Sequence, residues 1–419
     1  MASAGLVVLV VVMLALRQSV PLLLLSVAGY AMLVWGDGEL TYLIEDIWYG
    51  TTTDLLLAIP MFLLAGNIMT RGSIAQRLID VVRVGTQWIH GGMAIATILS
   101  CALFAAISGS SPVTMLAVGT VMMPALLEAG YPRRFALGAI TSAGTLGIII
   151  PPSIPLILYG IVNEKSIVDL FVAGLVPGLL LAGALAAYSY VRNRHMPAEP
   201  FDRAAFVRAL RRGVWSMLLP VILLGGIYSG YFSPTEAAAV SVLYALLVEI
   251  FIHRELKPAQ FIGLTVDTAR MLGTLMPIVA VALSLQKLLT INQVQQDLAA
   301  WVTGLVDSKV AFLLVVNLLL LVLGCLVDVI SAVLVVSPLL LAPAMAYGID
   351  PIHFGIMMVI NLEIGFLTPP VGLNLIVAMS AFKAGFAEVV RAVLPFIALM
   401  LAVLMLVTYV PELSLWLVN

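Results

Sequence analysis

The sequence predicts an all-α integral membrane protein built as an inverted repeat, with two re-entrant helical hairpins and two broken helices. Three observations predict this fold: the hydropathy of the whole chain, two apolar windows that are too long for one span, and a double proline that recurs 218 residues later. The first repeat is expected at 1–191 and the second at 214–419, with an arginine-rich cytoplasmic linker at 192–213 between them.

The hydropathy of the chain indicates a lipid environment. Of the 419 residues, 62% are hydrophobic and 10% are charged, and the mean hydropathy is +1.14. Soluble proteins carry about 25% charged residues, so this composition cannot supply a normal water-exposed surface. Apolar runs of about 20 residues recur along the chain, as many membrane-spanning helices require. The net charge of −2 gives no indication of a nucleic-acid partner.

The apolar windows give the expected membrane segments. The first window, 3–16, lacks a cationic leader and a cleavage site, so it is predicted to be a membrane segment rather than a signal peptide. Cys101 and Cys325 lie within apolar runs, which argues against a disulfide framework or a metal cluster. The windows are 3–16, 19–35, 54–70, 93–129, 134–162, 168–191, 214–231, 236–252, 274–291, 310–346, 352–381 and 391–411.

Two of these windows, 93–129 and 310–346, are predicted to be helical hairpins. Each is too long for one span and is interrupted near its middle, by SGSSP at 108–112 and by the polar stretch from Asp328 to Ser331. A hairpin enters the membrane and returns to the same side. The distribution of basic residues supports this interpretation: if the linker is cytoplasmic, all of the 20 basic residues except Lys165, Lys287 and Lys309 fall on the cytoplasmic side or next to it.

The windows at 134–162 and 352–381 are predicted to be broken helices related by the repeat. Two adjacent prolines remove backbone donors and clash with the preceding turn, which costs a helix about 3 kcal/mol or more. Since the two hairpins enter from opposite sides, the halves are inverted, a feature of secondary transporters with a site near the bilayer midplane. When the sequence is aligned with itself at an offset of 218 residues, the matched pairs are Gly147 with Gly365, Pro151 with Pro369, Pro152 with Pro370, Gly130 with Gly348, and Ser110 with Asp328.

The hairpin tips and the helix breaks are the candidate binding regions. Unwound backbone at membrane depth exposes carbonyl groups to a cation and helix N-termini to an anion. Hydroxyl and carbonyl oxygens of the first tip suit Na⁺ or a bound carboxylate. The candidate ion or ligand positions, which the family resemblance given below assigns to Na⁺, are Ser108, Gly109, Ser110, Ser111, Gly144, Gly147, Pro151, Asp328, Gly365 and Thr368. The predicted substrate contacts are Ser110, Thr114, Pro152, Ser153, Asp328, Pro370 and Asn374.

Structural alternatives remain for several of these residues. The prolines alone would kink two packed helices, and the small residues of the first tip would serve helix packing. Asp328 is expected to be a cation ligand or the N-cap of a hairpin helix, because a carboxylate within a membrane needs a partner. Glu363 and Asn374 flank the second break and would satisfy local backbone or touch a ligand.

Other polar features have structural explanations. Ser233, Pro234 and Glu236 in SPTEAAA are predicted to form a capping box at a helix start. The segments 72–90 and 257–272 mix charged and apolar residues, and are predicted to be amphipathic helices in the cytoplasmic interface. Asn67 is expected to face either the scaffold or the site.

Catalytic motifs are missing from the sequence, so no enzyme activity and no organic cofactor are expected. The four histidines form no HExxH pair, and the chain contains neither a Gly-x-Ser-x-Gly elbow nor a Walker-type phosphate loop. Without a nucleotide site, energy for any transport must come from an ion gradient or a partner.

Several motifs together resemble one known family. AISGSSPVT, TLGIIIPPSIPLILYG, LFVAGLVPG, SPTEAAAV, GIDPIHFG and NLEIGFLTPPVGLNLIVA are similar, in this order, to the large membrane subunit of tripartite ATP-independent periplasmic (TRAP) transporters, the DctM-like family. The resemblance extends from LLAIPMFLLAGN to the C-terminus. The SGSSPVT tip resembles the C4-dicarboxylate-type members more than the sialic-acid ones.

This resemblance implies an importer of organic acids in the inner membrane of a bacterium or archaeon, driven by a Na⁺ gradient. It also implies an elevator-type mechanism with a scaffold and a moving transport domain, and Na⁺ ligands at both tips and both breaks. The implied partners are a small four-helix membrane subunit (DctQ-like) and a soluble periplasmic substrate-binding protein (DctP-like). The small subunit is expected to be a separate polypeptide, since this chain contains no additional four-helix segment.

Two alternatives to this function remain. A stand-alone ion-coupled carboxylate transporter would share the architecture without needing a binding protein. A channel or an intramembrane enzyme is the third possibility, but the inverted repeat argues against a simple pore and the missing motifs argue against an enzyme.

Overall fold

The computed structural model describes residues 20–35 and 40–418, together with isolated positions before Val20. The described residues form helices and connecting turns, without a β-strand among them. Ten helices in this part of the chain are long and apolar enough to cross a membrane. The predicted membrane segment at 3–16 lies, apart from isolated positions, outside the described residues.

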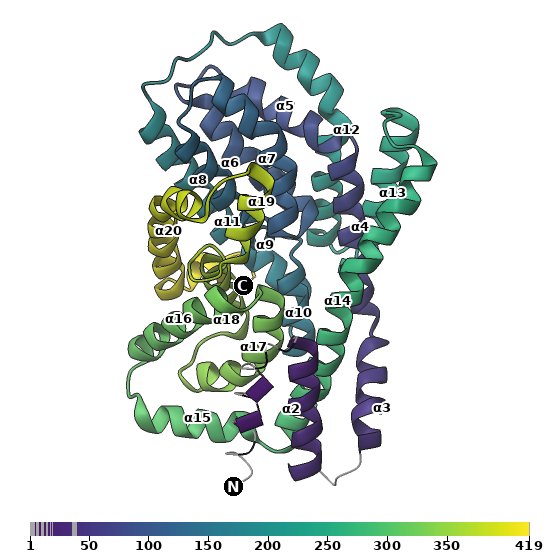
Figure 1. Ribbon diagram of the computed structural model, residues 1–419, viewed down its shortest axis with the longest axis vertical. Coiled ribbons are helices and arrows are strands. Elements are labelled where there is room, and N and C mark those ends of the chain that lie inside the picture. The colour runs from purple at the N-terminus through teal and green to yellow at the C-terminus, as the bar shows by residue number, and fades with distance from the viewer. Residues whose placement is uncertain are drawn as a thin grey trace.

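The first half contains two N-terminal helices followed by the first hairpin and the first broken helix (Figure 1). Its helices are α2 (Val20–Trp35), α3 (Leu40–Thr51), α4 (Ala58–Arg71), α5 (Ile74–Thr86), α6 (Gly92–Ser108), α7 (Ser111–Glu128), α8 (Arg133–Gly144), α9 (Leu146–Ile149), α10 (Ile154–Val162) and α11 (Ile167–Asn193).

The second half repeats this order after a connection at 194–202. Its helices are α12 (Arg203–Tyr228), α13 (Pro234–Leu247), α14 (Pro258–Ile291), α15 (Val294–Leu305), α16 (Lys309–Leu326), α17 (Val329–Ala346), α18 (Pro351–Gly365), α19 (Leu373–Phe382), α20 (Phe386–Tyr409) and α21 (Glu412–Leu415). A π-helical turn at Val248–Ile252 extends α13.

The two halves follow the same plan in opposite orientations. Adding 218 to the bounds of α7, 111 and 128, gives 329 and 346, the bounds of α17. Gly130 and Gly348, which follow these two helices, both take positive φ angles, 83° and 67°. The two helices that precede the hairpins lie at opposite ends of the molecule: α5 is at the top and α15 at the bottom of Figure 1.

Both predicted hairpins and both predicted broken helices are present. The first hairpin is α6 and α7, and the second is α16 and α17. The helix α8–α9–α10 is interrupted at 150–153, and α18–α19 at 366–372, where in each case the prolines cannot donate a backbone hydrogen bond. The Pro151–Pro152 and Pro369–Pro370 peptide bonds are both cis, so the two breaks share this backbone geometry.

The predicted capping box at the start of α13 is confirmed. The backbone N–H of Glu236 donates to Ser233 Oγ (3.2 Å), and the backbone N–H of Ser233 donates to Glu236 Oε2 (2.8 Å). Asn67, whose orientation the sequence left open, donates from α4 to Thr268 Oγ1 on α14 (2.9 Å). It therefore joins two helices rather than facing the hairpin tips.

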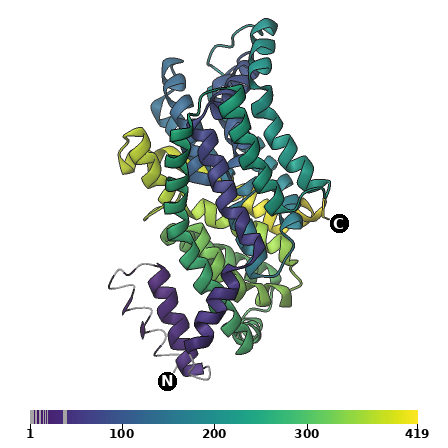
Figure 2. The ribbon, with the colours of Figure 1, turned by 90° about the vertical axis from the view of Figure 1, so that its right-hand side faces the viewer.

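The prediction for 257–272 is wrong. These residues do not form a separate interfacial helix, because they continue without a break into the apolar segment that was expected to begin at 274, and α14 is one helix from Pro258 to Ile291. No capping or stop signal separates the two parts. Gly273 is accepted inside the helix, and so is Pro277, as proline often is in membrane helices. The helices α2 and α3 pack on the C-terminal half of α14, at one end of the molecule (Figure 2).

A buried glutamate links the two halves where α5 begins. Glu249, at the end of α13, has no exposed surface, and its Oε1 accepts the backbone N–H groups of Ser73 and Ile74 at 2.7 Å each. These donors are among those that a helix N-terminus leaves without intrahelical partners. A Cβ on Gly72 would lie 2.2 Å from the Glu249 carboxylate carbon, so glycine is required for this approach.

Candidate functional site at the hairpin tips and helix breaks

The first tip is a compact turn with buried hydroxyl groups. Helix α6 ends at Ser108, and Gly109 takes a left-handed conformation (φ +60°) that reverses the chain before α7 begins. Ser108 Oγ is hydrogen-bonded to Thr114 Oγ1 and also donates to the Ser110 carbonyl (3.4 Å). Ser108, Ser111 and Thr114 are all buried. The hydroxyl groups therefore face one another and the protein interior rather than lipid.

The first break packs directly against this tip. The Ile154 N–H donates to the Gly109 carbonyl (3.4 Å). A Cβ on Gly147 would lie 2.4 Å from Thr114 Oγ1 and 2.5 Å from the Ser110 carbonyl oxygen, so only glycine permits this distance. Oxygen atoms of the tip thus surround the backbone of the break.

Other predicted residues of the first break are in structural positions. Gly144 packs against α7, where a Cβ would lie 2.6 Å from Met115 Cβ. The Ser153 hydroxyl caps α10 by accepting the N–H of Leu156 (3.4 Å). Pro151, Pro152 and Ser153 are buried, and α11 covers this side of the break through Gly174 and Gly178.

At the second tip, Asp328 is the N-cap residue of α17 and also lines the site. Asp328 Oδ1 accepts the backbone N–H of Ser331 (2.9 Å), and Oδ2 accepts the Ser331 hydroxyl. Of the two roles expected for Asp328, the structure shows the cap of α17. The side chain is half-buried and also lines the cavity described below.

The second break mirrors the first in its contact with a tip. The N–H of Gly372 donates to the Cys325 carbonyl on α16 (3.3 Å). A Cβ on Gly365 would lie 2.6 Å from Gly324 Cα, so α16 and α18 touch through their backbones. Thr368 donates its hydroxyl to the Ile364 carbonyl (2.8 Å). Unlike the buried first break, this one is exposed at Pro370.

Both tips and both breaks line one cavity of about 420 Å³. The tips contribute Gly109, Ser110 and Asp328, and the opposite wall comes from α4 and α14. The sequence predicted that Ser110 and Asp328 lie near a common site, and the structure brings them to one cavity. Pro152, Ser153, Pro370 and Asn374 are not among its lining residues. The α14 wall consists of Met271, Thr274, Leu275 and Ile278.

Four helix N-termini meet at this cavity. Residues from the first turns of α7, α10, α17 and α19 line it, namely Pro112, Ile154, Pro155, Val329, Ile330 and Leu373. Free backbone N–H groups and the helix dipole make a helix N-terminus favourable for an anion. No lysine or arginine is present among the described residues that line the cavity. The charged side chain among the described lining residues is that of Asp328, so attraction of an anion there would have to come from backbone N–H groups.

A buried polar cluster connects the two halves beside the first tip. Asn374 on α19 donates to Ser111 Oγ and to Glu363 Oε1 (3.2 Å). All three side chains are buried, and within the described residues Glu363 Oε2 and Asn374 Oδ1 have no hydrogen-bond partner. A second buried amide pair, Asn361 to Asn317 Oδ1 (2.6 Å), joins α18 to α16 and was not identified from the sequence. Isolated asparagines in apolar runs were its only signal.

One known family matches this sequence over almost its whole length. The sequence model described as "Tripartite ATP-independent periplasmic transporter, DctM component" matches residues 7–413. The chain belongs to the DctM family of TRAP transporters. Residues of both hairpins and both breaks fall within the matched range, so the sequence resemblance is confirmed.

Relatives of this DctM-family chain are transporter permeases rather than enzymes. It is 44% identical to the C4-dicarboxylate TRAP transporter large permease protein DctM of Pseudomonas aeruginosa, over 87% of this chain and 86% of that protein. It is 40% identical to the isethionate TRAP transporter permease protein DctMQ of Oleidesulfovibrio alaskensis, over 94% of this chain and 62% of that protein.

The fold is also shared with a solved transporter of low sequence similarity. The crystal structure of the Alcanivorax borkumensis YdaH transporter aligns with a TM-score of 0.62 and 16% identity, and covers 91% of this chain and 90% of that one. The likeness concerns the fold alone. The DctM-family chain is thus a multi-pass membrane protein with a transporter architecture.

Proposed function

We propose that this chain is the large permease of a TRAP transporter that imports a small organic acid together with Na⁺. The observation that carries this proposal is the cavity between the two tips and the two breaks, at which four helix N-termini meet. Family membership supplies the transporter class, and the cavity supplies a location and a chemistry for the cargo.

The proposed cargo is a C4-dicarboxylate or a related carboxylate. Helix N-termini favour a negatively charged group without requiring a basic side chain. Ser110 places a hydroxyl group at the same cavity, where it can donate to a carboxylate. The Thr274 hydroxyl also lines the cavity, but it donates to the Met271 carbonyl (2.7 Å). The names of the two relatives refer to small organic anions, which agrees with this chemistry.

The proposed Na⁺ positions lie where oxygen atoms collect beside the breaks. At the first tip, Thr114 Oγ1 and the Ser110 carbonyl lie beside Gly147, and the Ser108 hydroxyl is hydrogen-bonded to both. At the second break, the Gly365 carbonyl accepts the backbone N–H of Thr368, whose hydroxyl group is adjacent. Hydroxyl and carbonyl oxygens are suitable ligands for a hard cation. The other predicted ligands at these four regions belong to the same proposal.

The proposed setting is the bacterial inner membrane, with two partners. A tripartite transporter requires two further components, which we assign to a small four-helix membrane subunit and a periplasmic substrate-binding protein. The excess of basic residues on one side supports placing the linker 192–213 in the cytoplasm. Substrate selection would then depend on the binding protein as well as on this chain.

The proposed mechanism is of the elevator type. The hairpins and broken helices form one wall of the cavity, whereas α4 and α14 form the other. The α4 and α14 residues that line it are apolar apart from Thr274, and no hydrogen bond between described residues crosses the cavity from them. Such a surface permits one unit to slide against the other with few polar bonds to break.

Reconstituted uptake tests the proposal. Proteoliposomes containing this chain and the small subunit, with an inward Na⁺ gradient, are expected to take up a labelled C4-dicarboxylate only when the binding protein is added. Uptake should cease when the Na⁺ gradient is abolished. Robust uptake by this chain alone would contradict the proposal and favour a stand-alone ion-coupled transporter.

A further inference from the structure

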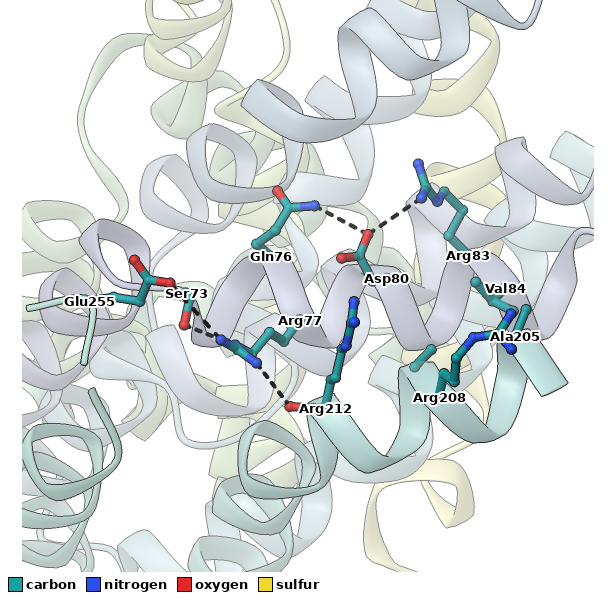
Figure 3. A pocket seen from close by; sticks show the side chains of 11 residues that line it. Ser73, Gln76, Arg77, Asp80, Arg83, Val84, Ala205, Arg208, Arg212 and Glu255 are labelled. Carbon is teal, nitrogen blue, oxygen red and sulfur yellow. Dashed lines mark hydrogen bonds and ion pairs between the residues drawn. The ribbon is translucent and has the colours of Figure 1, made fainter. Parts of the chain in front are cut away.

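A second pocket, of about 480 Å³, lies between α5 and α12, away from the hairpin tips (Figure 3). One of its walls is α5, with Arg77, Asp80 and Arg83, and the other is α12, with Arg208 and Arg212. On α12 the small residues Ala205 and Ala209 also line the pocket and leave space between the helices. Nothing in the proposed transport mechanism uses this site.

The pocket carries more positive than negative charge. Its lining includes four arginines and two acidic residues, Asp80 and Glu255. On α5 the arginines are already engaged: Arg77 donates to Ser73 Oγ (3.0 Å) and lies 4.0 Å from Glu255, while Arg83 lies 3.6 Å from Asp80.

The α12 arginines are less engaged. The nearest carboxylate to Arg208 is that of Asp202, outside the pocket, at 3.8 Å. Within the described part of the chain, the Arg212 guanidinium has neither a hydrogen bond nor an ion pair. Both side chains extend from α12 towards α5 (Figure 3). The Arg212 guanidinium is therefore available to a ligand between the helices, and Arg208 can join it by leaving its exposed ion pair with Asp202.

The residues around the pocket are those expected at the depth of a lipid headgroup layer. The arginines of α12 lie between Arg203 and Arg212, and the helix is uncharged from Gly213 to its end at Tyr228. Trp215 on α12 and Trp88 just after α5 are both exposed, at 41% and 53%. Tryptophan is enriched at the membrane–water interface, so these two side chains mark that level.

We propose that this pocket binds a phosphate group. The guanidinium fork matches phosphate oxygens in bidentate geometry, and basic pockets at this depth suit anionic headgroups. The phosphate would be supplied by an anionic phospholipid of the adjacent leaflet or by a soluble phosphate compound. A bound phosphate offsets the repulsion among the arginines and ties α5 of the first half to α12 of the second.

Native mass spectrometry of the purified chain tests this proposal. The probes are phosphatidylglycerol, phosphatidylcholine and inorganic phosphate, and the variants are Arg212→Gln and Arg211→Gln. Arg211 is the matched control, because it is the next exposed arginine on α12 but does not line the pocket. We expect Arg212→Gln to weaken phosphatidylglycerol binding about tenfold, the effect of losing one charge-assisted contact, and Arg211→Gln to weaken it less than about twofold.

The three probes distinguish a phospholipid from a soluble phosphate compound as the bound ligand. Tight binding of phosphatidylglycerol over phosphatidylcholine, with the same Arg212 dependence, identifies a lipid. Binding of inorganic phosphate with that dependence, without a preference for phosphatidylglycerol, identifies a soluble phosphate. Equal losses in both variants, or full affinity of Arg212→Gln for both anionic probes, would overturn the proposal.

Discussion

At the scale of single residues, the contact between the first tip and the first break depends on the absence of a side chain at Gly147. The space that a Cβ would need is occupied by Thr114 Oγ1 and the Ser110 carbonyl. The backbone of the break can approach these oxygen atoms only because the residue is glycine. A methyl group there would push the tip away from the break.

Gly147→Ala is therefore expected to reduce reconstituted uptake strongly while membrane insertion is preserved. The matched control is Gly183→Ala on α11, where a Cβ would meet no atom within 4 Å. At that exposed position of the helix, alanine should be neutral or slightly stabilising. Equal uptake by the two variants would show that close contact between tip and break is not needed.

Asn374 is the residue on which the buried cluster between the halves depends. Asn374→Ala leaves Ser111 and Glu363 without their shared partner, so thermal unfolding in detergent is expected to show a loss of about 1–3 kcal/mol. The comparison is Asn292→Ala just after α14, whose side chain bonds, among the described residues, only to the Leu288 carbonyl one turn earlier. A loss no larger than that of Asn292→Ala would mean that the cluster is energetically unimportant.

At the scale of elements, the start of α5 is held by a carboxylate from the other half. A helix N-terminus needs acceptors for its first N–H groups, and here Glu249 supplies one across 175 residues of sequence. The contact positions α5 beside α12, where the arginine pocket lies.

Glu249→Ala is expected to lower the free energy of unfolding by about 1–3 kcal/mol, because two buried N–H groups lose their acceptor. Hydrogen exchange at residues 73–77 should accelerate as well. Glu255→Ala is the control, since that exposed carboxylate lies 4.0 Å from Arg77 and surface ion pairs contribute about 1 kcal/mol or less. Equal effects of the two substitutions would contradict the capping role.

The hairpins could be predicted well from the sequence. The predicted hairpin at 93–129 corresponds to helices covering 92–128, and 310–346 to helices covering 309–346. These boundaries depend on local signals, namely a polar interruption at each tip and glycine after each hairpin. The capping box of α13 is equally local.

Contacts between distant segments were beyond sequence reasoning. The Asn374–Ser111 and Glu249–Ser73 bonds join residues 263 and 176 positions apart, and nothing at either end specifies the partner. The continuous α14 was also missed, because Asp267 and Arg270 interrupt the apolar run without ending the helix, and no local signal separates the two parts. Within the candidate site, α11 packs through Gly174 and Gly178 on Ile149, Ile150 and Pro151, which no local pattern indicated.

At the scale of the whole molecule, the proposed elevator mechanism requires the hairpins and broken helices to move together against α4 and α14. Leu275 on α14 and Ile330 on α17 line the cavity from opposite sides. A double variant with cysteine at both positions, linked by a short bifunctional thiol reagent, is expected to lose uptake. A reagent with an internal disulfide should allow reductant to restore it. The variants with only one of the two added cysteines serve as controls, since they keep the native Cys101 and Cys325. Full uptake by the linked protein would contradict the elevator proposal.

The central claim is that the two tips form the site of cation-coupled transport. The Na⁺ dependence of uptake by Ser110→Ala and Asp328→Ala tests it most directly. Asp350→Ala is the control, because Asp350 also caps a helix, α18, through Ile352 and His353, but does not line the cavity. If the tips bind the coupling ion, both tip variants will need several-fold more Na⁺ for half-maximal uptake, whereas Asp350→Ala will keep the native dependence. An unchanged Na⁺ response in both tip variants would contradict it.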